Sequence, residues 1–281
     1  MFLNFNGEVR EEGMALLRAD NRGFRYGDGL FETMLVREGK VRLGEYHLER
    51  LTEGMRRLRL EFPTPALPRP FSLDLLEGQI VELCARNGQD GWVRARLTVF
   101  RSGSGLFNGP ERYADSILQT SALKGSSGWR DDGLVLGVFP DGWKACDAYS
   151  GIKSNNYQLS TQAGMYAGEK GWDDCVLLNS RGRVAETTVA NIWWIKGGAI
   201  YTPPLSEGGV AGVMRRWLLD ALPAAGYRVW EEPIGVDGLA EVEEIFISNA
   251  IRGVQWVRKL GGIELGCRLA AVIHEEIIQK I

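Results

Sequence analysis

Residues 150–157 read SGIKSNNY, an uncharged stretch apart from its single lysine, Lys153. The apolar residues 134–139 before it predict a strand, and residues 155–169 predict a helix that Gly171 ends. The chain has eight lysines against 25 arginines, and only Lys153 lies at a strand-to-helix junction within an uncharged stretch. A lysine in a polar loop is most often a solvated surface residue, so other motifs must support a catalytic role for it.

The rest of the C-terminal half predicts alternating strands and helices. Strands are expected at residues 175–179, 189–195, 199–202 and 244–248, and further helices at 213–221 and 268–280. This mixture predicts an α/β domain. We expect the domain to span residues 133–281, to be the larger of two and to carry Lys153.

The N-terminal part, residues 1–123, predicts a smaller α/β domain of strands and two helices. Residues 30–36 and 40–43 predict a hairpin, residues 45–60 a helix, residues 72–86 a second helix and residues 92–101 a strand. Ser72 can cap the second helix, and prolines at 63, 65, 68 and 70 end the first. Residues 124–132, KGSSGWRDD, are polar and contain glycine, which predicts an inter-domain linker.

The composition excludes several classes of protein. The 281 residues carry a net charge of −3 without a block of like charge, which argues against nucleic-acid binding. No apolar run is long enough to span a membrane, so we expect a cytoplasmic protein without a membrane partner. Four widely spaced cysteines and two histidines, His47 and His274, predict reduced thiols and no metal site.

Glu186 is a second candidate for chemistry. It lies in residues 185–191, AETTVAN, which lead into an apolar strand containing Trp193 and Trp194. A buried carboxylate needs a cationic partner, because an unpaired buried charge is costly. A protonated pyridine nitrogen would satisfy Glu186, and so would an ordinary ion pair with Arg183.

Residues 208–215, GGVAGVMR, form a glycine-rich turn that opens a predicted helix. The free backbone N–H groups at a helix N-terminus can bind an anion such as phosphate. Arg50, on the inner side of the first predicted helix, could add a bidentate contact. Glycine-rich helix starts are also common without a bound anion, and the spacing here is not that of a P-loop.

Taken together, the motifs resemble those of the class IV, or fold type IV, pyridoxal 5′-phosphate (PLP) aminotransferases. The resemblance rests on RGFRYGDGLFET at 22–33 with HLERL at 47–51, on the Lys153 stretch, and on residues 186–191, 212–215 and 248–253. Their order and separation match the family over nearly the whole chain. The resemblance implies an α/β fold of two lobes (α+β, D-amino acid aminotransferase-like), PLP as cofactor and a homodimer.

The resemblance also implies roles for single residues. Lys153 would be the Schiff-base lysine and proton shuttle, Glu186 the partner of the pyridine nitrogen, and Arg50 a phosphate ligand. The backbone N–H groups of Val213 and Met214 would bind the phosphate, and further cofactor contacts would come from Tyr157, Asn191 and Asn249. His47 would be structural.

Within the family, the chain looks most similar to 4-amino-4-deoxychorismate lyases. Thr33, Met214 and residues 249–253 each resemble the lyase form, and Thr33 would be catalytic beside Lys153. The substrate carries two carboxylates, for which Arg94, Arg101 and Arg252 are candidates together with Phe31 as a substrate contact. An aminotransferase of branched-chain or D-amino acids with a 2-oxo acid acceptor stays open, as does a catalytically silent PLP protein.

Overall fold

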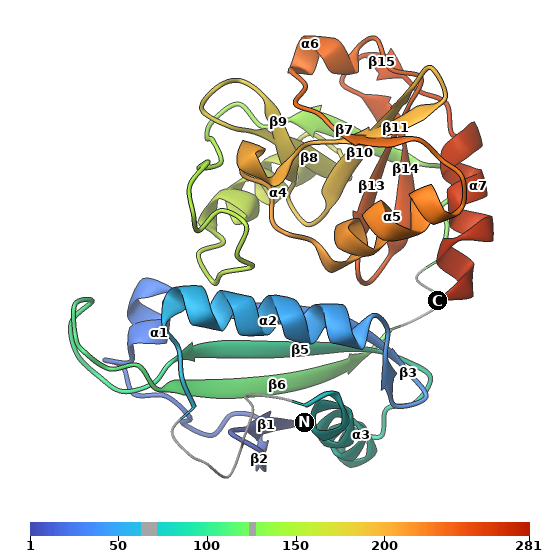
Figure 1. Cartoon of the computed structure of the whole chain (residues 1–281). Coiled ribbons are helices and arrows are strands. Elements are labelled where there is room, and N and C mark those ends of the chain that lie inside the picture. The colour runs from blue at the N-terminus through green and yellow to red at the C-terminus, as the bar shows by residue number, and fades with distance from the viewer. Residues whose placement is uncertain (63–71, 124–127) are drawn as a thin grey trace. The chain divides into compact units, whose positions relative to one another are not determined.

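The computed structural model describes residues 1–62, 72–123 and 128–281. By its contacts the chain divides into two compact units (Figure 1). The first unit comprises Met1–Ser126 with Ile152–Asn156, and the second comprises Ser127–Gly151 with Tyr157–Ile281. The expected linker, residues 124–132, spans this division, and its residues 124–127 lie outside the described part of the chain.

The first unit is built on an antiparallel sheet of six strands in the order β2-β1-β6-β5-β3-β4. The strands are β1 (Phe2–Phe5), β2 (Glu8–Glu11), β3 (Gly29–Arg37), β4 (Lys40–Val41), β5 (Trp92–Arg101) and β6 (Ala114–Ala122). The helices are α1 (Arg22–Tyr26), α2 (Gly44–Leu58) and α3 (Leu73–Asn87). The expected hairpin, both expected helices and the strand at 92–101 are therefore present.

Local signals explain the helix ends. The Ser72 hydroxyl accepts the Leu75 N–H at the start of α3, and Gly88 ends that helix in the left-handed conformation, with a φ of 61°. Helix α2 already ends at Leu58, where Arg59 takes a left-handed φ of 53°. The prolines expected to stop it lie outside the described residues.

Alternation along the strands gives the sheet two different faces. One face packs with α2 and α3 into the core of this unit, and Figure 1 shows α2 lying along it. The core is formed mainly by Leu30, Met34, Leu51, Met55, Ile80, Leu83, Val93, Leu97, Val99 and Leu118. Phe31, Thr33, Arg94 and Arg96 alternate with these residues on β3 and β5, so they lie on the opposite face.

The lysine stretch extends this sheet. The Phe31 N–H donates to the Lys153 carbonyl at 2.9 Å, and the Asn155 N–H donates to the Gly29 carbonyl at 2.9 Å. Leu30 and Ser154 form an antiparallel bridge between these bonds. Lys153 therefore belongs to the first unit by contact, which differs from the expected C-terminal domain, because pairing over more than 100 residues leaves no local sequence signal.

The second unit contains a mixed sheet of nine strands. Its order is β12-β11-β10-β13-β14-β7-β8-β9, with β15 on β14. The strands are β7 (Leu134–Val138), β8 (Asp174–Leu178), β9 (Val184–Thr187), β10 (Asn191–Lys196), β11 (Ala199–Thr202), β12 (Val229–Glu231), β13 (Glu244–Asn249), β14 (Gly253–Leu260) and β15 (Ile263–Glu264). The helices are α4 (Gln158–Glu169), η1 (Leu205–Glu207), α5 (Val213–Ala224), α6 (Val236–Leu239), α7 (Arg268–Glu276) and η2 (Ile278–Lys280).

Most expected elements of this unit are present, with two differences. The helix expected at 268–280 is α7 followed by a short 3₁₀ turn, η2. Strands β9, β12, β14 and β15 and the short helices η1 and α6 were not expected, although β9 carries Glu186 and β14 joins β13 to β7 in the middle of the sheet. Among the described residues, no helix is both long enough and apolar enough to cross a membrane.

The core of the first unit predicts a large effect of Leu83→Ala. Leu83 is fully buried on α3, so its truncation should lower the free energy of unfolding by about 2 to 5 kcal/mol in urea denaturation. Val81→Ala is the matched control, because Val81 is half exposed on the same helix, and it should cost less than about 0.5 kcal/mol. Equal effects of the two substitutions would contradict this description of the core.

Candidate active site

In the first unit, the Lys153 amine lies over an aromatic ring beside a guanidinium group. Its Nζ is 4.6 Å from the centroid of the Phe31 ring, and the central carbon of the Arg96 guanidinium is 3.8 Å from the same centroid. Thr33 pairs with Arg96 across β3 and β5 and so lies on the same face of the sheet. The Lys153 amine and the Arg96 guanidinium thus both lie on the Phe31 ring, and Thr33 lies on the same face of the sheet.

Arg96 was not among the expected site residues, although Arg94 was. Both side chains lie on the face of β5 opposite the core, and both line a cavity of about 200 Å³ in the first unit. The other lining residues are Met1, Phe2, Glu12, Gln119, Thr120 and Ser121. The alternation of arginine with apolar residues in 93–97 was the available sequence signal for Arg96.

On the face of the sheet that packs against α2, Glu32 fixes Arg50. The buried Glu32 carboxylate accepts from Arg50 Nε at 2.8 Å and from a terminal Arg50 nitrogen at 2.5 Å. Its second oxygen also lies 2.6 Å from His47 Nδ1. Burial alone would raise the pKa of Glu32, but the charge of Arg50 and the contacts with His47 outweigh it and lower that pKa to about 2.

His47 is held neutral in this cluster. Burial lowers its pKa, and Glu32 only partly offsets that effect. The neutral ring can donate its Nδ1–H to the carboxylate of Glu32. The structural role expected for His47 is therefore to help orient Glu32, which in turn orients the Arg50 guanidinium.

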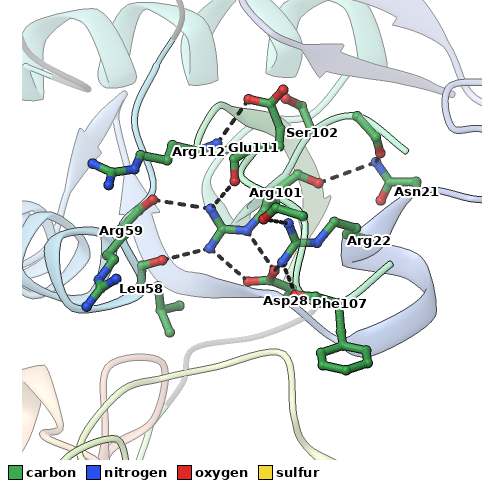
Figure 2. A network of polar contacts seen from close by, with 12 residues as sticks. Asn21, Arg22, Asp28, Leu58, Arg59, Arg101, Ser102, Phe107, Glu111 and Arg112 are labelled. Carbon is green, nitrogen blue, oxygen red and sulfur yellow. Dashed lines mark hydrogen bonds and ion pairs between the residues drawn. The ribbon is translucent and has the colours of Figure 1, made fainter. Parts of the chain in front are cut away.

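Arg101 has a different role from the one expected. Figure 2 shows its guanidinium enclosed by Asp28 and by backbone carbonyls. Nε and one terminal nitrogen donate to the two Asp28 oxygens at 2.7 and 3.2 Å. The remaining donors reach the carbonyl oxygens of Leu58 at 2.7 Å, Glu111 at 2.9 Å and Arg59 at 3.2 Å. All five N–H donors of an arginine are then used, which leaves none for a substrate carboxylate.

In the second unit, Glu186 on β9 is paired with a lysine. Lys144 Nζ lies 2.7 Å from Glu186 Oε1, and the Val210 N–H donates to Oε2 at 2.8 Å. The alternative partner, Arg183, instead binds the carboxylate of Glu207 at 2.8 Å. Glu186 is therefore a buried carboxylate with a cationic partner, and that partner, Lys144, was not expected.

The side chain of Asn191 fixes the turn at residues 208–212, which precedes α5. The Asn191 side-chain amide donates to the Val210 carbonyl at 2.9 Å, so Asn191 acts on the turn and not as an isolated ligand. A Cβ on Gly212 would lie 1.8 Å from Asn191 Oδ1, and only glycine fits there. Gly212 leads into the 12-residue helix α5, whose first residues are Val213 and Met214.

The start of α5 can receive an anion. No side chain caps this terminus within the described part of the chain, and no acidic residue lies in its first turn. The N–H groups of the first turn therefore have no side-chain acceptor in the structure. A phosphate group would supply the missing acceptors, and the helix dipole would favour its charge.

The other expected residues of this unit lie near residues 188 and 189. The Tyr157 hydroxyl donates to the Thr188 carbonyl. Asn249 and Arg252 line a cavity of about 230 Å³ together with Thr188, Val189 and the buried Asp174. Burial raises the pKa of Asp174, although hydrogen bonds from Thr188 and Thr187 oppose this.

In the second unit, the N–H groups at the start of α5 suit a phosphate, and the buried Glu186 carboxylate suits a ring nitrogen. In the first unit, the Lys153 amine could react with a carbonyl group, and the Arg50 guanidinium, oriented by Glu32, could bind an anion. No group of three or more His, Cys, Asp or Glu side chains among the described residues could hold a metal ion.

Comparisons with known proteins agree with this chemistry. The family model of class IV amino-transferases matches residues 29–260. An aminodeoxychorismate lyase of Vibrio harveyi is 27% identical over 83% of both chains. A bifunctional aminodeoxychorismate lyase / D-amino acid transaminase of Mycobacterium tuberculosis is 27% identical over 99% of this chain and 97% of the relative.

Solved structures share the fold. A branched-chain aminotransferase of Thermoproteus uzoniensis, solved with norvaline, superposes with a TM-score of 0.85 at 21% identity and covers 100% of this chain and 95% of that one. A hypothetical aminotransferase of Mycobacterium tuberculosis in a PLP-bound form has a TM-score of 0.81 at 24% identity, over 98% and 96% of the two chains. The two-lobe α/β fold expected from the sequence is confirmed.

The network around Arg101 predicts a structural effect. Arg101→Met removes the main partner of Asp28 and should lower the free energy of unfolding by about 3 to 5 kcal/mol, measured by urea denaturation without any ligand. Arg112→Met is the control, because that exposed arginine only approaches Glu61 at 3.6 Å and should cost under about 1 kcal/mol. An unchanged stability of the Arg101 variant would show that the network contributes nothing.

The low pKa of Glu32 predicts a pH dependence of stability. A carboxyl whose pKa falls from 4.5 to about 2 on folding adds stability that is complete above pH 4.5 and disappears as the pH falls towards 2. The stability difference between the protein and its Glu32→Gln variant should therefore be largest above pH 5 and shrink below pH 4.5. Denaturation from pH 3 to 7 measures it, with the exposed Glu82→Gln as control. A difference that does not change with pH would contradict the assignment.

Proposed function

The chain belongs to the class IV aminotransferase family, and we propose that within this family it is a lyase converting 4-amino-4-deoxychorismate to 4-aminobenzoate and pyruvate. Membership makes it an enzyme, lyase or aminotransferase, that depends on PLP. The observation that carries the lyase proposal is the pairing of Thr33 with Arg96 beside Lys153 and Phe31. The names of the Vibrio and Mycobacterium relatives support it.

We assign the cofactor contacts from the donors described above. In the second unit, Glu186 binds the ring nitrogen and the first turn of α5 binds the phosphate, with Asn191 holding the turn before that helix. In the first unit, Arg50 binds the phosphate in the orientation that Glu32 gives it. We also propose that Asn249 and Tyr157, in the second unit, contact the cofactor.

The bound cofactor supplies an electron sink for the electron pair left on substrate C4 when its proton is removed. Lys153 Nζ accepts that proton, for which the amine must be neutral. The C–O bond to the enolpyruvyl group then breaks, the ring becomes aromatic, and the departing enolpyruvate takes up a proton to give pyruvate. The reaction balances without water and without a second substrate.

Thr33 and the arginines of β5 act on the substrate itself. The Thr33 hydroxyl can donate a hydrogen bond to the departing oxygen, where negative charge develops. Arg96 is suited to one of the two substrate carboxylates because it lies on the same Phe31 ring as the Lys153 amine. Arg94 lines the neighbouring cavity and is the candidate for the other carboxylate.

The second candidate function is amino-group transfer between D- or branched-chain amino acids and 2-oxo acids. It is favoured by the bifunctional Mycobacterium relative, whose name joins a lyase and a D-amino acid transaminase. Both reactions begin with removal of a proton by the same lysine, so Lys153 and Glu186 serve either one. We also propose a homodimer, which sedimentation of the purified protein would detect as twice the mass of the chain.

The lyase proposal predicts a definite stoichiometry. The purified protein with PLP should release pyruvate and 4-aminobenzoate in equal amounts from aminodeoxychorismate, with no 2-oxo acid added, over many turnovers. Chromatography of both products measures this. Consumption of D- or branched-chain amino acids with 2-oxoglutarate, without consumption of aminodeoxychorismate, would replace the lyase by the second candidate.

Two substitutions extend this test. Lys153→Ala should abolish turnover, because no base then removes the C4 proton. Thr33→Val should slow the lyase reaction by about tenfold, since one hydrogen bond to a developing charge contributes about 1.5 kcal/mol. Thr33→Ser keeps the hydroxyl and should stay close to the unchanged enzyme. Equal rates of the Val and Ser variants would remove Thr33 from the mechanism.

A further inference from the structure

Lys144 is a cation that the reaction described above does not use. Its ammonium lies 2.7 Å from Glu186 Oε1, and both side chains are largely buried, with 17% and 7% of their surfaces exposed. The other oxygen of Glu186 accepts only a neutral backbone N–H, that of Val210. The charge of Glu186 is thus balanced by Lys144 within the second unit.

Lys144 is held firmly in place by its backbone. Its N–H donates to the Leu178 carbonyl at 2.8 Å, and it forms a parallel bridge with Asn179. The next residue, Ala145, packs against the turn that precedes α5, because a Cβ on Gly208 would lie 2.2 Å from the Ala145 carbonyl oxygen. The ion pair therefore joins three segments, at 144–145, 186 and 208–210.

The other charged groups around β9 are occupied elsewhere. Glu207 is bound by Arg183 and by the Asn179 side chain at 2.7 Å. Asp174, at the start of β8, accepts hydrogen bonds from the Thr188 hydroxyl and N–H. Within the described residues, Lys144 is the one cation within ion-pair distance of Glu186.

We propose that Lys144 is a positioning residue for the cofactor, which keeps Glu186 ionised and oriented before the ring nitrogen binds to it. The inference rests on the proposed contact between Glu186 and that nitrogen. A buried carboxylate without a cation takes up a proton, because isolated charge is costly to bury. Once protonated, Glu186 is a poor acceptor for the N–H of the ring. Lys144 prevents this and so widens the pH range in which the cofactor binds.

The test compares PLP affinities across pH. Equilibrium dialysis of the full-length protein against PLP from pH 6 to 9 gives dissociation constants for the unchanged protein and for Lys144→Met. Their ratio cancels the titration of PLP itself. We expect the ratio to rise as the pH falls, by up to about tenfold per pH unit, because one proton is linked to binding.

Matched variants separate charge from packing. Lys144→Arg keeps the cation and should give a nearly constant ratio, close to one. Lys196→Met removes an exposed lysine that pairs with Glu241 in the same unit, and it should leave the affinity unchanged. In a Glu186→Gln background, Lys144→Met should add no pH dependence, because the carboxylate is gone.

The outcomes are distinct. A ratio for Lys144→Met that stays constant with pH, or equal behaviour of the Met and Arg variants, would overturn the role of Lys144 even if affinity fell. If Glu186→Gln bound PLP with unchanged affinity and an unchanged visible spectrum, the proposed contact of Glu186 itself would fail. The inference is supported if the ratio for Lys144→Met rises as the pH falls, while the ratio for Lys144→Arg stays close to one and the Glu186→Gln background removes the rise.

Discussion

Two backbone hydrogen bonds, between Phe31 and Lys153 and between Asn155 and Gly29, determine where the Lys153 amine lies. They add residues 152–156 to the free edge of β3, beyond the part of that strand that pairs with β4. Because the bonds use main-chain groups, the side chains of this stretch stay available for other contacts. The Lys153 amine can then reach Phe31, and the proposed chemistry follows from that contact.

Each of the two units pairs a buried glutamate with a cationic side chain. Glu32 is neutralised by Arg50 and bound by His47, and Glu186 is neutralised by Lys144 and bound by the Val210 N–H. A charge buried without a partner would destabilise either unit, so each pair is complete before any ligand binds. Pre-formed pairs of this kind reduce the cost of ordering side chains on binding. The proposed cofactor contacts of Arg50 and Glu186 are thus prepared by groups that need not touch the cofactor.

Helices and strands with local signals could be predicted from the sequence, whereas contacts between residues far apart in the chain could not. The Ser72 cap and the alternation of residues 92–101 placed α3 and β5 correctly. Strand β14 was missed because it is buried along most of its length and lacks the alternation of a half-buried strand. At the site, Arg101 was assigned to a substrate because its partner Asp28 is 73 residues away. Lys144 was missed for the same reason, since its role depends on a contact with β9.

The division of the chain has a consequence for synthesis. The polypeptide passes from one unit to the other three times, after residues 126, 151 and 156. When the ribosome has made the first 126 residues, the start of β3 is still an uncovered strand edge, the kind of edge on which chains aggregate. It is covered only after residues 152–156 have emerged, so nascent chains stay vulnerable over that interval. If the gene were divided after residue 126, the first fragment alone would keep this edge exposed, and only the second fragment, which contains residues 152–156, could cover it.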